Sequence, residues 1–385
     1  MNNVLALCNA PISLVDVIVK EYISLDSISK EKLLVNDEKL TLIIPKDISI
    51  INKLKAKGLD EFDDFMIEDY YGKKIAVFYG NCHMENLLEC LSKHQPFTDE
   101  YVIYPIKPIY TVKDDCYFDD PIFKNCDLFI HQSIRKNNRY GEKFASENII
   151  KSLKTSCRVI SVPNVYHLPM CFFPQYTEDQ ELKHRIGHTM FFRDKIIDAL
   201  YKKGVGATKI VKLYSSSNNG ITQNEIDNLW SIFLDKIKLR EKDWDVKVLD
   251  FIKDNKNKKL FFDPNHPSSL LIKYIAKELC EILNIDSAKI DDICIKSMDT
   301  YEMPICNSVI AFFEMDRLVS NDIYRKTGNK VICVEMGIKE YVNQYISYLW
   351  QDKSFSTIIR LKSFIKYLKY FIYRNIIMKL KGDKR

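Results

Sequence analysis

A cysteine and a histidine, far apart in the chain, each stand where an apolar strand pattern gives way to a helical one. The stretch "AVFYGNCHMENLLECL" passes through Gly80, Asn81 and Cys82 into its helix, and "LFFDPNHPSSLLIKYIAKELCEIL" carries Asp263 and His266 at its turn. A cysteine at a helix N-terminus lies where the helix dipole and backbone N–H groups stabilise negative charge. The sequence therefore predicts a nucleophile at the first corner.

Asp263 and His266 supply the other groups that a nucleophile needs. They are three positions apart in the chain, so the carboxylate can accept a hydrogen bond from the imidazole and fix its tautomer. Acyl transfer by a nucleophile requires a base within reach and a group that orients the base. We therefore predict Cys82, His266 and Asp263 as catalytic residues. The structural alternatives are a cysteine packed at a tight turn and residues that only cap a helix.

Further polar residues stand near predicted strand ends and could bind substrate or an oxyanion. His83 could be a second base or a substrate ligand, but an exposed position on the first helical turn is favoured. The amides of Gln132 and Asn164 could equally satisfy loop backbone. The predicted oxyanion and substrate-binding set is Gly80, Asn81, His83, Gln132, Asn164, Asn265 and Ser268.

The elements that position these residues alternate between strand and helix. From Lys73 onward, strand patterns at 73–80, 100–106, 126–134 and 157–163 are interleaved with helical patterns at 83–94 and 141–153. This alternation is typical of an α/β fold with a mostly parallel central sheet. Because ligands bind beyond the carboxyl ends of such strands, both corners are predicted to lie at that edge.

The remaining segments frame this region. Residues 13–25 predict a helix and 39–45 a strand, within an N-terminal α/β extension covering 1–72. Residues 180–258 are mainly helical, with a helix at 191–204 ending at a glycine and a long helical pattern at 224–255. The predicted domains are 1–72, a catalytic domain at 73–315, and a C-terminal extension at 316–385.

Composition restricts the class of protein. With 46% hydrophobic and 28% charged residues, a disordered chain is excluded, and no apolar run is long enough to predict a spanning helix. The first residues lack the basic leader of a signal peptide. Eleven cysteines at irregular spacing, without a CxxC pair, favour free thiols in a reducing, cytoplasmic compartment. Paired ligands are missing even around His184 and His188, so no metal is expected.

The positive charge is concentrated at the C-terminus. Residues 351–385 hold ten Lys or Arg and two Asp. The whole chain has a net charge of +5, so the residues before 351 carry a net negative charge. A local charge does not fit a protein that coats nucleic acid. Apolar residues at helical spacing predict a basic amphipathic helix at 355–382. It could lie on the inner face of the membrane, or pack on its own domain or on a partner subunit, and an oligomer is compatible with the sequence.

Short motifs give a family resemblance. "DPNHP" resembles the last motif of the SGNH or GDSL hydrolases, and "YGNC" resembles their first block with cysteine in place of serine. A narrower resemblance rests on "GNCHMENLLECL", "CDLFIHQSI", "VPNVYHLPMCFFPQY", "RDKIIDALYKKG", "LREKDWDVKVLDFI" and the DPNHP segment. Over residues 73–315 the chain is similar to the WcbI-type family of capsule polysaccharide biosynthesis proteins.

This resemblance implies a three-layer SGNH-like fold, binding of coenzyme A, and O-acetyl transfer from acetyl-CoA in bacterial surface-glycan assembly. Gly80, Asn81 and Cys82 match the GNC motif of the family, and 265–268 match its NHPS motif. Gln132 matches the polar residue after a DxF-type strand of the family, and Pro163 and Asn164 match its later PN turn. His83 stands where the family pattern has glutamine. The cluster Arg135, Lys136 and Arg139 could hold the phosphates of coenzyme A or form a solvated loop.

Three functions follow from these observations. The preferred one is acyl transfer to a glycan, a sugar nucleotide or a lipid-linked sugar, at the inner face of the membrane. The first alternative is a glycan esterase, which would use the same residues with water as the acceptor. The second is a non-catalytic glycan-assembly subunit, in which the GNC corner only packs.

Overall fold

The structure is a computed structural model, and it describes residues 4–7, 19–23, 34–35, 38–39, 41–44, 48–62, 65–70, 72–112, 121–165, 168–178, 192–216, 219–295, 301–315, 324–326, 334–349, 365 and 368. The chain forms two compact units. Unit 1 comprises Met1–Asn164, Asp243–Lys247 and Ile275–Cys294, and unit 2 comprises Val165–Lys242, Val248–Tyr274 and Ile295–Arg385. The predicted domain limits stay a prediction.

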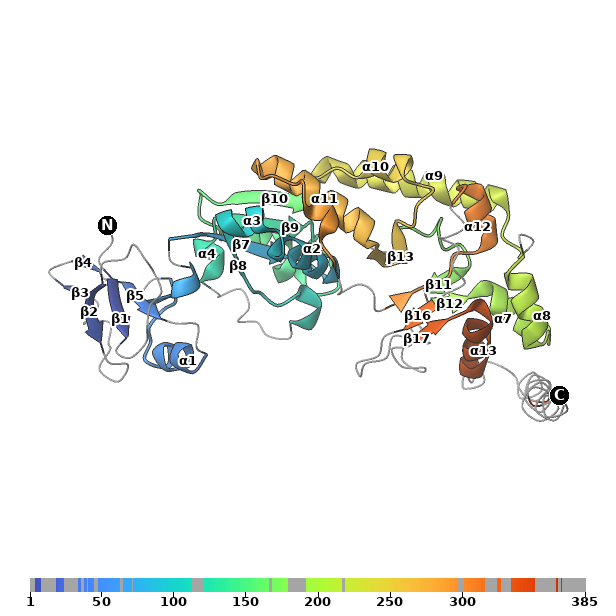
Figure 1. The fold of residues 1–385 in the computed structure, drawn as a ribbon, viewed down its shortest axis with the longest axis horizontal. Coiled ribbons are helices and arrows are strands. Elements are labelled where there is room, and N and C mark those ends of the chain that lie inside the picture. The colour runs from blue at the N-terminus through green and yellow to red at the C-terminus, as the bar shows by residue number, and fades with distance from the viewer. Residues whose placement is uncertain are drawn as a thin grey trace, which may run out of the picture. The chain divides into compact units, whose positions relative to one another are not determined.

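The central sheet of unit 1 confirms the predicted α/β arrangement (Figure 1). Its strands are all parallel and follow the order β10-β9-β7-β8. The inner strands β7 and β9 are buried along almost their whole length, as parallel strands covered on both faces are. The strands are β7 (Lys74–Tyr79), β8 (Tyr101–Tyr104), β9 (Leu128–Gln132) and β10 (Arg158–Val162).

Helices follow the strands as the alternation predicts. Phe78 of β7 packs on Phe97, and its neighbours Val77 and Tyr79 point to the opposite side, where they join a cluster with Phe123 and Phe144. The connecting helices are α2 (Cys82–Ser92), α3 (Gln95–Glu100), η3 (Ile109–Thr111), α4 (Ile122–Asn125), η5 (Glu142–Phe144), α5 (Ser146–Ile150) and η7 (Ile290–Asp292).

The N-terminal residues form a second parallel sheet, of order β2-β1-β5-β6. Leu42 and Phe65 of this region belong to the same apolar cluster as Val77, so it shares the core of unit 1. The helix predicted at 13–25 is wrong at Val19–Ile23, which form β2 beside β1. The elements are β1 (Val4–Leu7), β2 (Val19–Ile23), β3 (Leu34–Val35), β4 (Glu38–Lys39), β5 (Thr41–Ile44), α1 (Ile48–Ala56), β6 (Phe65–Ile67) and η2 (Glu68–Tyr70).

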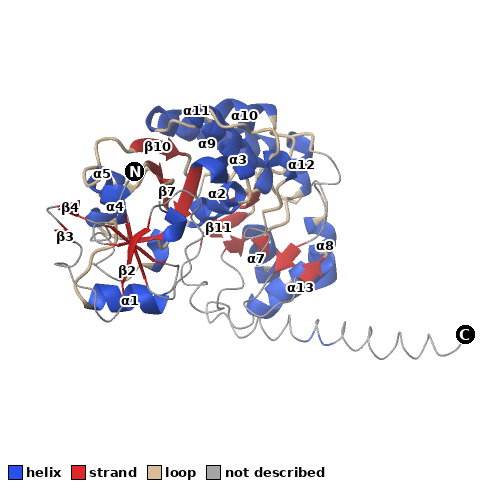
Figure 2. Ribbon diagram, turned by 60° about the vertical axis from the view of Figure 1, so that its left-hand side comes forward, coloured by secondary structure: helices blue, strands red, loops and turns tan. Residues whose placement is uncertain are grey.

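Unit 2 is mainly helical, and its helices α7, α8 and α13 pack together (Figure 2). The long helical pattern at 224–255 is divided between α9 and α10, with η6 after α9. The elements that lie in or begin in unit 2 are β11 (Tyr176–Glu178), β12 (Phe192–Asp194), α7 (Lys195–Lys202), α8 (Ala207–Tyr214), α9 (Gln223–Arg240), η6 (Glu241–Asp243), α10 (Leu249–Asp254), β13 (Phe261–Asp263), β14 (His266–Pro267), α11 (Ser269–Leu283), β15 (Tyr301–Glu302), α12 (Asn307–Phe312), β16 (Tyr324–Lys326), β17 (Val334–Met336) and α13 (Ile338–Leu349).

A short return of the chain lies along the edge strand β10. The N–H of Ser161 and its hydroxyl both donate to the Asp245 carboxylate, at 2.7 and 2.8 Å. In return, the N–H groups of Asp245 and Val246 reach the Ser161 carbonyl. Residues 243–247 therefore belong to unit 1, although the chain before and after them belongs to unit 2.

The predicted amphipathic helix at 355–382 and the histidines at 184 and 188 lie outside the described residues, apart from Ile365 and Leu368. These two are helical, with 47% and 43% of their surface exposed. Across the part of the chain that the structure describes, no helix has the length and apolarity needed to cross a membrane.

Candidate functional site

The GNC corner joins the carboxyl end of β7 to the first turn of α2. Asn81 caps the helix, because its side-chain oxygen accepts the N–H of His83 at 3.0 Å and its carbonyl accepts that of Met84 at 2.9 Å. Cys82 is the first residue of α2, and its thiol is free and half-buried. No acceptor in the described part of the chain takes the backbone N–H of Cys82. That donor is left for a ligand oxygen, as an oxyanion site requires.

Gln132, the last residue of β9, holds this corner from the neighbouring strand. Its side chain is buried; Oε1 accepts the N–H of Asn81 at 3.0 Å, and Nε2 donates to the carbonyl of Pro163 at 3.3 Å. One amide thus joins the segments that follow β7 and β10. Both ends of the Gln132 amide are occupied by backbone, so the geometry favours a positioning role over direct contact with substrate.

Gly80 is required by space at this corner. A Cβ atom there would lie 2.4 Å from Cγ of Met84 and 2.6 Å from Oε1 of Gln132, well inside contact distance. The Gly80 carbonyl also accepts the N–H of Ile109, which brings η3 against the corner. The glycine therefore permits the Gln132 contact on which the placement of Asn81 depends.

His83 lies on the inner face of α2 and is 4% exposed. The expectation of an exposed histidine on the first helical turn is wrong. Helical geometry explains the difference, since residue 83 shares its face with Asn86, Leu87 and Cys90, which are also buried. A substrate-binding role for His83 stays a prediction.

The second corner differs from its predicted form. Asp263 ends β13, and the chain turns through Pro264 and Asn265 into β14, so the segment is a two-stranded antiparallel hairpin. The predicted strand-to-helix corner of the parallel sheet is therefore wrong here. The helix that follows, α11, begins only at Ser269.

The hairpin nevertheless builds the predicted Asp–His pair. Oδ2 of the buried Asp263 lies 2.8 Å from Nδ1 of His266, whose side chain is 32% exposed. Oδ1 of the same carboxylate accepts the N–H groups of Asn265 and His266, at 2.6 and 3.0 Å. Nδ1 is thereby held by the carboxylate, which leaves Nε2 as the ring nitrogen that could act as a base.

The other predicted binding residues occupy varied positions. Asn164 follows Pro163 beyond β10 and is half-buried, as is Asn265 in the hairpin turn. Ser268 is buried, and no described residue forms a hydrogen bond with its hydroxyl. Gly80 to His83, Gln132 and Asn164 thus belong to unit 1, whereas Asp263 to Ser268 belong to unit 2.

The basic loop follows directly after β9. Arg135, Lys136 and Arg139 are all exposed. Lys136 pairs with Glu147 at 2.7 Å, and the guanidinium of Arg139 lies 4.9 Å from the ring centre of Tyr140. Because β9 ends at the residue that holds Asn81, the loop starts at the edge of the sheet that carries the GNC corner.

Two residues beside the corner were missed in the sequence. The hydroxyl of Tyr110 in η3 donates to Oε2 of Glu85 in α2 at 2.7 Å. Glu85 lies three residues after Cys82, on the same side of the helix. The only sequence signal was that "KPIY" follows the strand at 101–104, at the edge where ligands bind.

Comparison with known proteins identifies a similar family and a similar fold. The family model described as the polysaccharide biosynthesis enzyme WcbI matches residues 75–288. A solved structure of WcbI, "a novel polysaccharide biosynthesis enzyme", is similar, with a TM-score of 0.59 and 19% identity over 79% of this chain and 96% of that one. It is described as the native protein without a disulfide bond between coenzyme A and one of its cysteines.

At that identity, the similarity to the solved structure supports the fold alone. No curated protein matches the chain. The family model, however, covers more than half of the residues, including the GNC corner and the DPNHP hairpin. The chain belongs to the WcbI family of polysaccharide biosynthesis enzymes.

Proposed function

We propose that the protein transfers an acetyl group from acetyl-CoA to a sugar hydroxyl during the synthesis of a bacterial surface polysaccharide. The observation that carries the proposal is the position of Cys82. It is the first residue of α2, at the carboxyl edge of a parallel sheet, with a free thiol and a backbone N–H directed to no described acceptor. This combination suits a nucleophile with an oxyanion donor beside it.

The exposed basic loop fits a phosphate-bearing donor. Lys136 and Glu147 are each about half exposed, so their ion pair contributes little and can be exchanged for a phosphate. Arg135 and Arg139 add two more cations on the same loop, and arginine suits phosphate oxygens. When bound, acetyl-CoA supplies an acyl group already activated as a thioester.

The residues of the chain can then catalyse the transfer by one of two routes. In a covalent route, the Cys82 sulfur attacks the acyl carbonyl, coenzyme A leaves as its thiol, and the sugar hydroxyl later displaces Cys82. His266 takes the proton of that hydroxyl at Nε2, while Asp263 holds Nδ1. In a direct route, His266 plays the same part and Cys82 contributes only its backbone N–H. Both routes require His266 to reach the acceptor hydroxyl.

Substitution of Cys82 tests the proposal. The purified protein is incubated with acetyl-CoA, and the acyl group is located by peptide mass spectrometry, with coenzyme A affinity measured by calorimetry. We expect an acetyl group on Cys82, its loss in Cys82→Ala, and no change in Cys294→Ala, which removes an exposed thiol. Normal turnover in Cys82→Ala would eliminate the covalent route.

The same measurements separate the alternatives. Release of acyl groups from a glycan without affinity for coenzyme A would identify an esterase. Unchanged glycan acylation in cells that carry both Cys82→Ala and His266→Ala would identify a non-catalytic subunit.

The SGNH-like three-layer arrangement and the attachment of residues 355–382 to the inner membrane face belong to the same proposal. A chain that ends at residue 349 should lose sedimentation with anionic lipid vesicles, whereas the full chain should retain it. Equal sedimentation of the two chains would remove the membrane role.

A further inference from the structure

An exposed aromatic ring lies beside the GNC corner. Tyr110 is 47% exposed, and the other exposed large apolar side chains of the described residues are aliphatic. Aromatic rings in the described region are otherwise mostly packed into the core, so an exposed ring of this size requires an explanation.

The ring is fixed in this position by two contacts. The N–H of Ile109 donates to the Gly80 carbonyl at 3.0 Å, and the Tyr110 hydroxyl donates to Glu85 at 2.7 Å. Cys82 and Glu85 are three residues apart on one helix, so a side chain bound to Glu85 lies next to the nucleophile. Partial desolvation and the Glu85 contact raise the pKa of Tyr110, with the Cys82 thiol as a further contributor, so its hydroxyl stays protonated and remains a donor.

The chemistry of this pair suits a sugar ring. The C–H groups on one side of a sugar can stack on an aromatic face, and its hydroxyls can donate to a carboxylate. Glu85 repels the phosphates of coenzyme A, and the adenine of that molecule is separated from its thioester by the whole pantetheine arm. A group next to Cys82 therefore meets the acceptor rather than the nucleotide.

We propose that Tyr110 and Glu85 form the binding platform for the sugar acceptor. The inference rests on the proposed function, because it names the substrate contact of that same site. Stacking on Tyr110 orients the sugar, and Glu85, itself held by the Tyr110 hydroxyl, accepts a hydrogen bond from a second hydroxyl of the ring.

The test measures glycan binding without the donor. The probe is an oligosaccharide prepared from the surface polysaccharide of the producing strain, with its acyl groups removed by mild base. Its affinity is measured by calorimetry for the wild type, Tyr110→Ala, Tyr110→Phe and Glu85→Gln. Glu89→Gln is the matched control, because it changes a carboxylate on the same helix that pairs with Lys93.

We expect Tyr110→Ala to weaken glycan binding about tenfold, as for loss of one aromatic contact, and Glu85→Gln to weaken it about threefold. Tyr110→Phe should keep most of the affinity, and Glu89→Gln all of it. Coenzyme A affinity should be unchanged in every variant. Glycan affinity that is equal in the wild type and Tyr110→Ala, or absent in the wild type, overturns the platform.

Failure of the platform and failure of the proposed function give different results. If the wild type binds the oligosaccharide but not coenzyme A, the acyltransferase proposal fails and the platform stands. If Tyr110→Ala loses coenzyme A affinity instead of glycan affinity, the ring contacts the donor and the platform is wrong.

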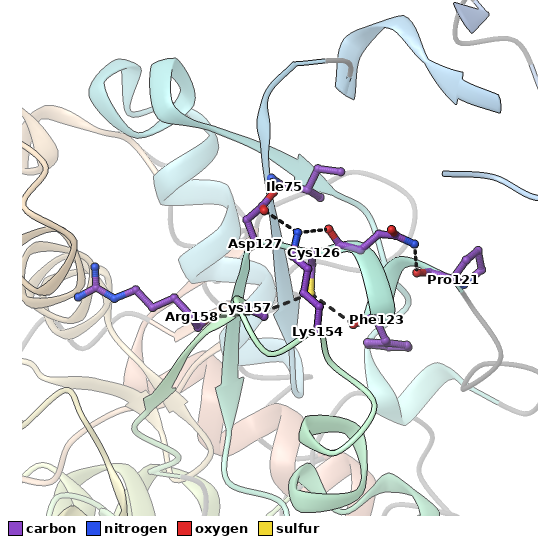
Figure 3. Close-up of polar contacts among 9 residues, drawn as sticks. Ile75, Pro121, Phe123, Cys126, Asp127, Lys154, Cys157 and Arg158 are labelled. Atoms are coloured by element: carbon purple, nitrogen blue, oxygen red, sulfur yellow. Dashed lines mark hydrogen bonds and ion pairs between the residues drawn. The ribbon is translucent and has the colours of Figure 1, made fainter. Parts of the chain in front are cut away.

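A separate observation concerns the opposite edge of the same sheet. Cys126 precedes β9 and Cys157 precedes β10, and their sulfur atoms lie 3.7 Å apart (Figure 3). Cys126 is buried, whereas Cys157 is half-buried and closer to solvent. Lys154 lies beside them, where it pairs with Asp127 at 2.6 Å. The contact with Cys126 and the positive charge of Lys154 lower the pKa of the Cys157 thiol, although burial opposes them.

We infer that Cys126 and Cys157 are a site of reversible disulfide formation by peroxides. The Cys157 thiolate attacks one oxygen of hydrogen peroxide, which breaks the O–O bond and gives a sulfenic acid and, after protonation of the leaving oxygen, water. The Cys126 thiol then attacks that sulfur, the S–S bond forms, and the sulfenic oxygen leaves as a second water. Two electrons pass from the thiols to the peroxide.

Peptide mapping after treatment with hydrogen peroxide tests this site. We expect one disulfide that joins Cys126 to Cys157, reversed by dithiothreitol, retained in Cys82→Ala and absent in Cys157→Ser. Cys157 oxidised without linkage to Cys126, or Cys126 linked to another cysteine, would overturn the inference.

Discussion

The GNC corner and the DPNHP hairpin use the same device over different distances. In each, a side-chain oxygen accepts backbone N–H groups and so fixes a residue predicted to be catalytic. At the corner, part of this support comes from Gln132, 51 residues away along the chain. In the hairpin, Asp263 alone binds the N–H groups two and three residues on and also the imidazole. The geometry of the GNC corner therefore depends on the pairing of β7 with β9, whereas the geometry of the hairpin depends only on contacts among residues 263–266.

The largest effect is expected at the hairpin, because one carboxylate has two functions there. Asp263→Asn keeps an oxygen that can accept both N–H groups, but it removes the charged partner of His266. We expect acyl transfer to fall by about 10²-fold or more, with little change in the melting temperature. Asp263→Ala should lose the same activity and also about 1 kcal/mol of stability, as for loss of a cap. Equal activity in the wild type and Asp263→Asn would remove Asp263 from the mechanism.

Asp194 offers the same local turn without an imidazole. Its carboxylate accepts the N–H groups of Ile196 and Ile197 at 3.0 Å, and Tyr341 donates to it from α13. Burial raises the pKa of Asp194 from 3.8 to about 7, opposed by hydrogen bonds and supported by the nearby Asp198. The folded state therefore holds a proton that the unfolded state releases.

This difference predicts the sign of a pH effect. The contribution of Asp194 to stability is full below pH 3.8 and is lost as the pH rises through about 7. Between these pH values, the contribution of Asp194 lowers the free energy of unfolding by no more than about 1.4 kcal/mol for each unit of rising pH. In urea unfolding at several pH values, the free energy of unfolding should fall less with rising pH in Asp194→Asn than in the wild type. An unchanged slope would show that Asp194 is ionised in the folded protein at neutral pH.

At the corner, Gly80→Ala should disturb the support from the neighbouring strand. The added methyl group meets Met84 and Gln132, so we expect a loss of about 1–3 kcal/mol on unfolding by urea, as for overpacking. The double variant with Met84→Ala relieves one of the two contacts and should recover only part of this loss. Full recovery of the lost stability would show that the Gln132 side chain can move away from the added methyl group without cost.

Gln132→Ala should lower the free energy of unfolding by about 1–2 kcal/mol, because it leaves the Asn81 N–H and the Pro163 carbonyl without their partner. Hydrogen exchange of the Asn81 amide should accelerate, while the amides of Asn265 and His266 stay protected by Asp263. Unchanged exchange at Asn81 would contradict the long-range support of the corner.

The same contrast explains what could be predicted from the sequence. The parallel strands β7 to β10 and the helix after Cys82 follow from periodicity, because each pattern is local and strong. The Asp263–His266 pair also follows from local spacing. The contact of Gln132 with Asn81 could not be predicted, because it depends on the pairing of β7 with β9, and a single sequence does not reveal which strands pair.

Two errors have similar physical causes. Val19–Ile23 contain apolar residues at spacings that suit a helix, but parallel pairing with Val4–Leu7 makes them a strand. The turn at Pro264 and Asn265 was expected to lead directly into a helix, but antiparallel pairing with β13 makes His266 and Pro267 a strand, and the helix begins only at Ser269. Tyr110 was missed because a single 3₁₀ turn has no periodic pattern that marks its residues as exposed.

The return of residues 243–247 onto β10 has a consequence for solubility. An open edge strand can pair with the edge of another molecule and so start aggregation. Here the free edge of the sheet is met by a segment that comes back from the other unit, and Asp245 binds both the N–H and the hydroxyl of Ser161. The negative charge at this edge also disfavours an incoming strand. A fragment cut before residue 243 would expose that edge, so the two units are best expressed as one continuous chain.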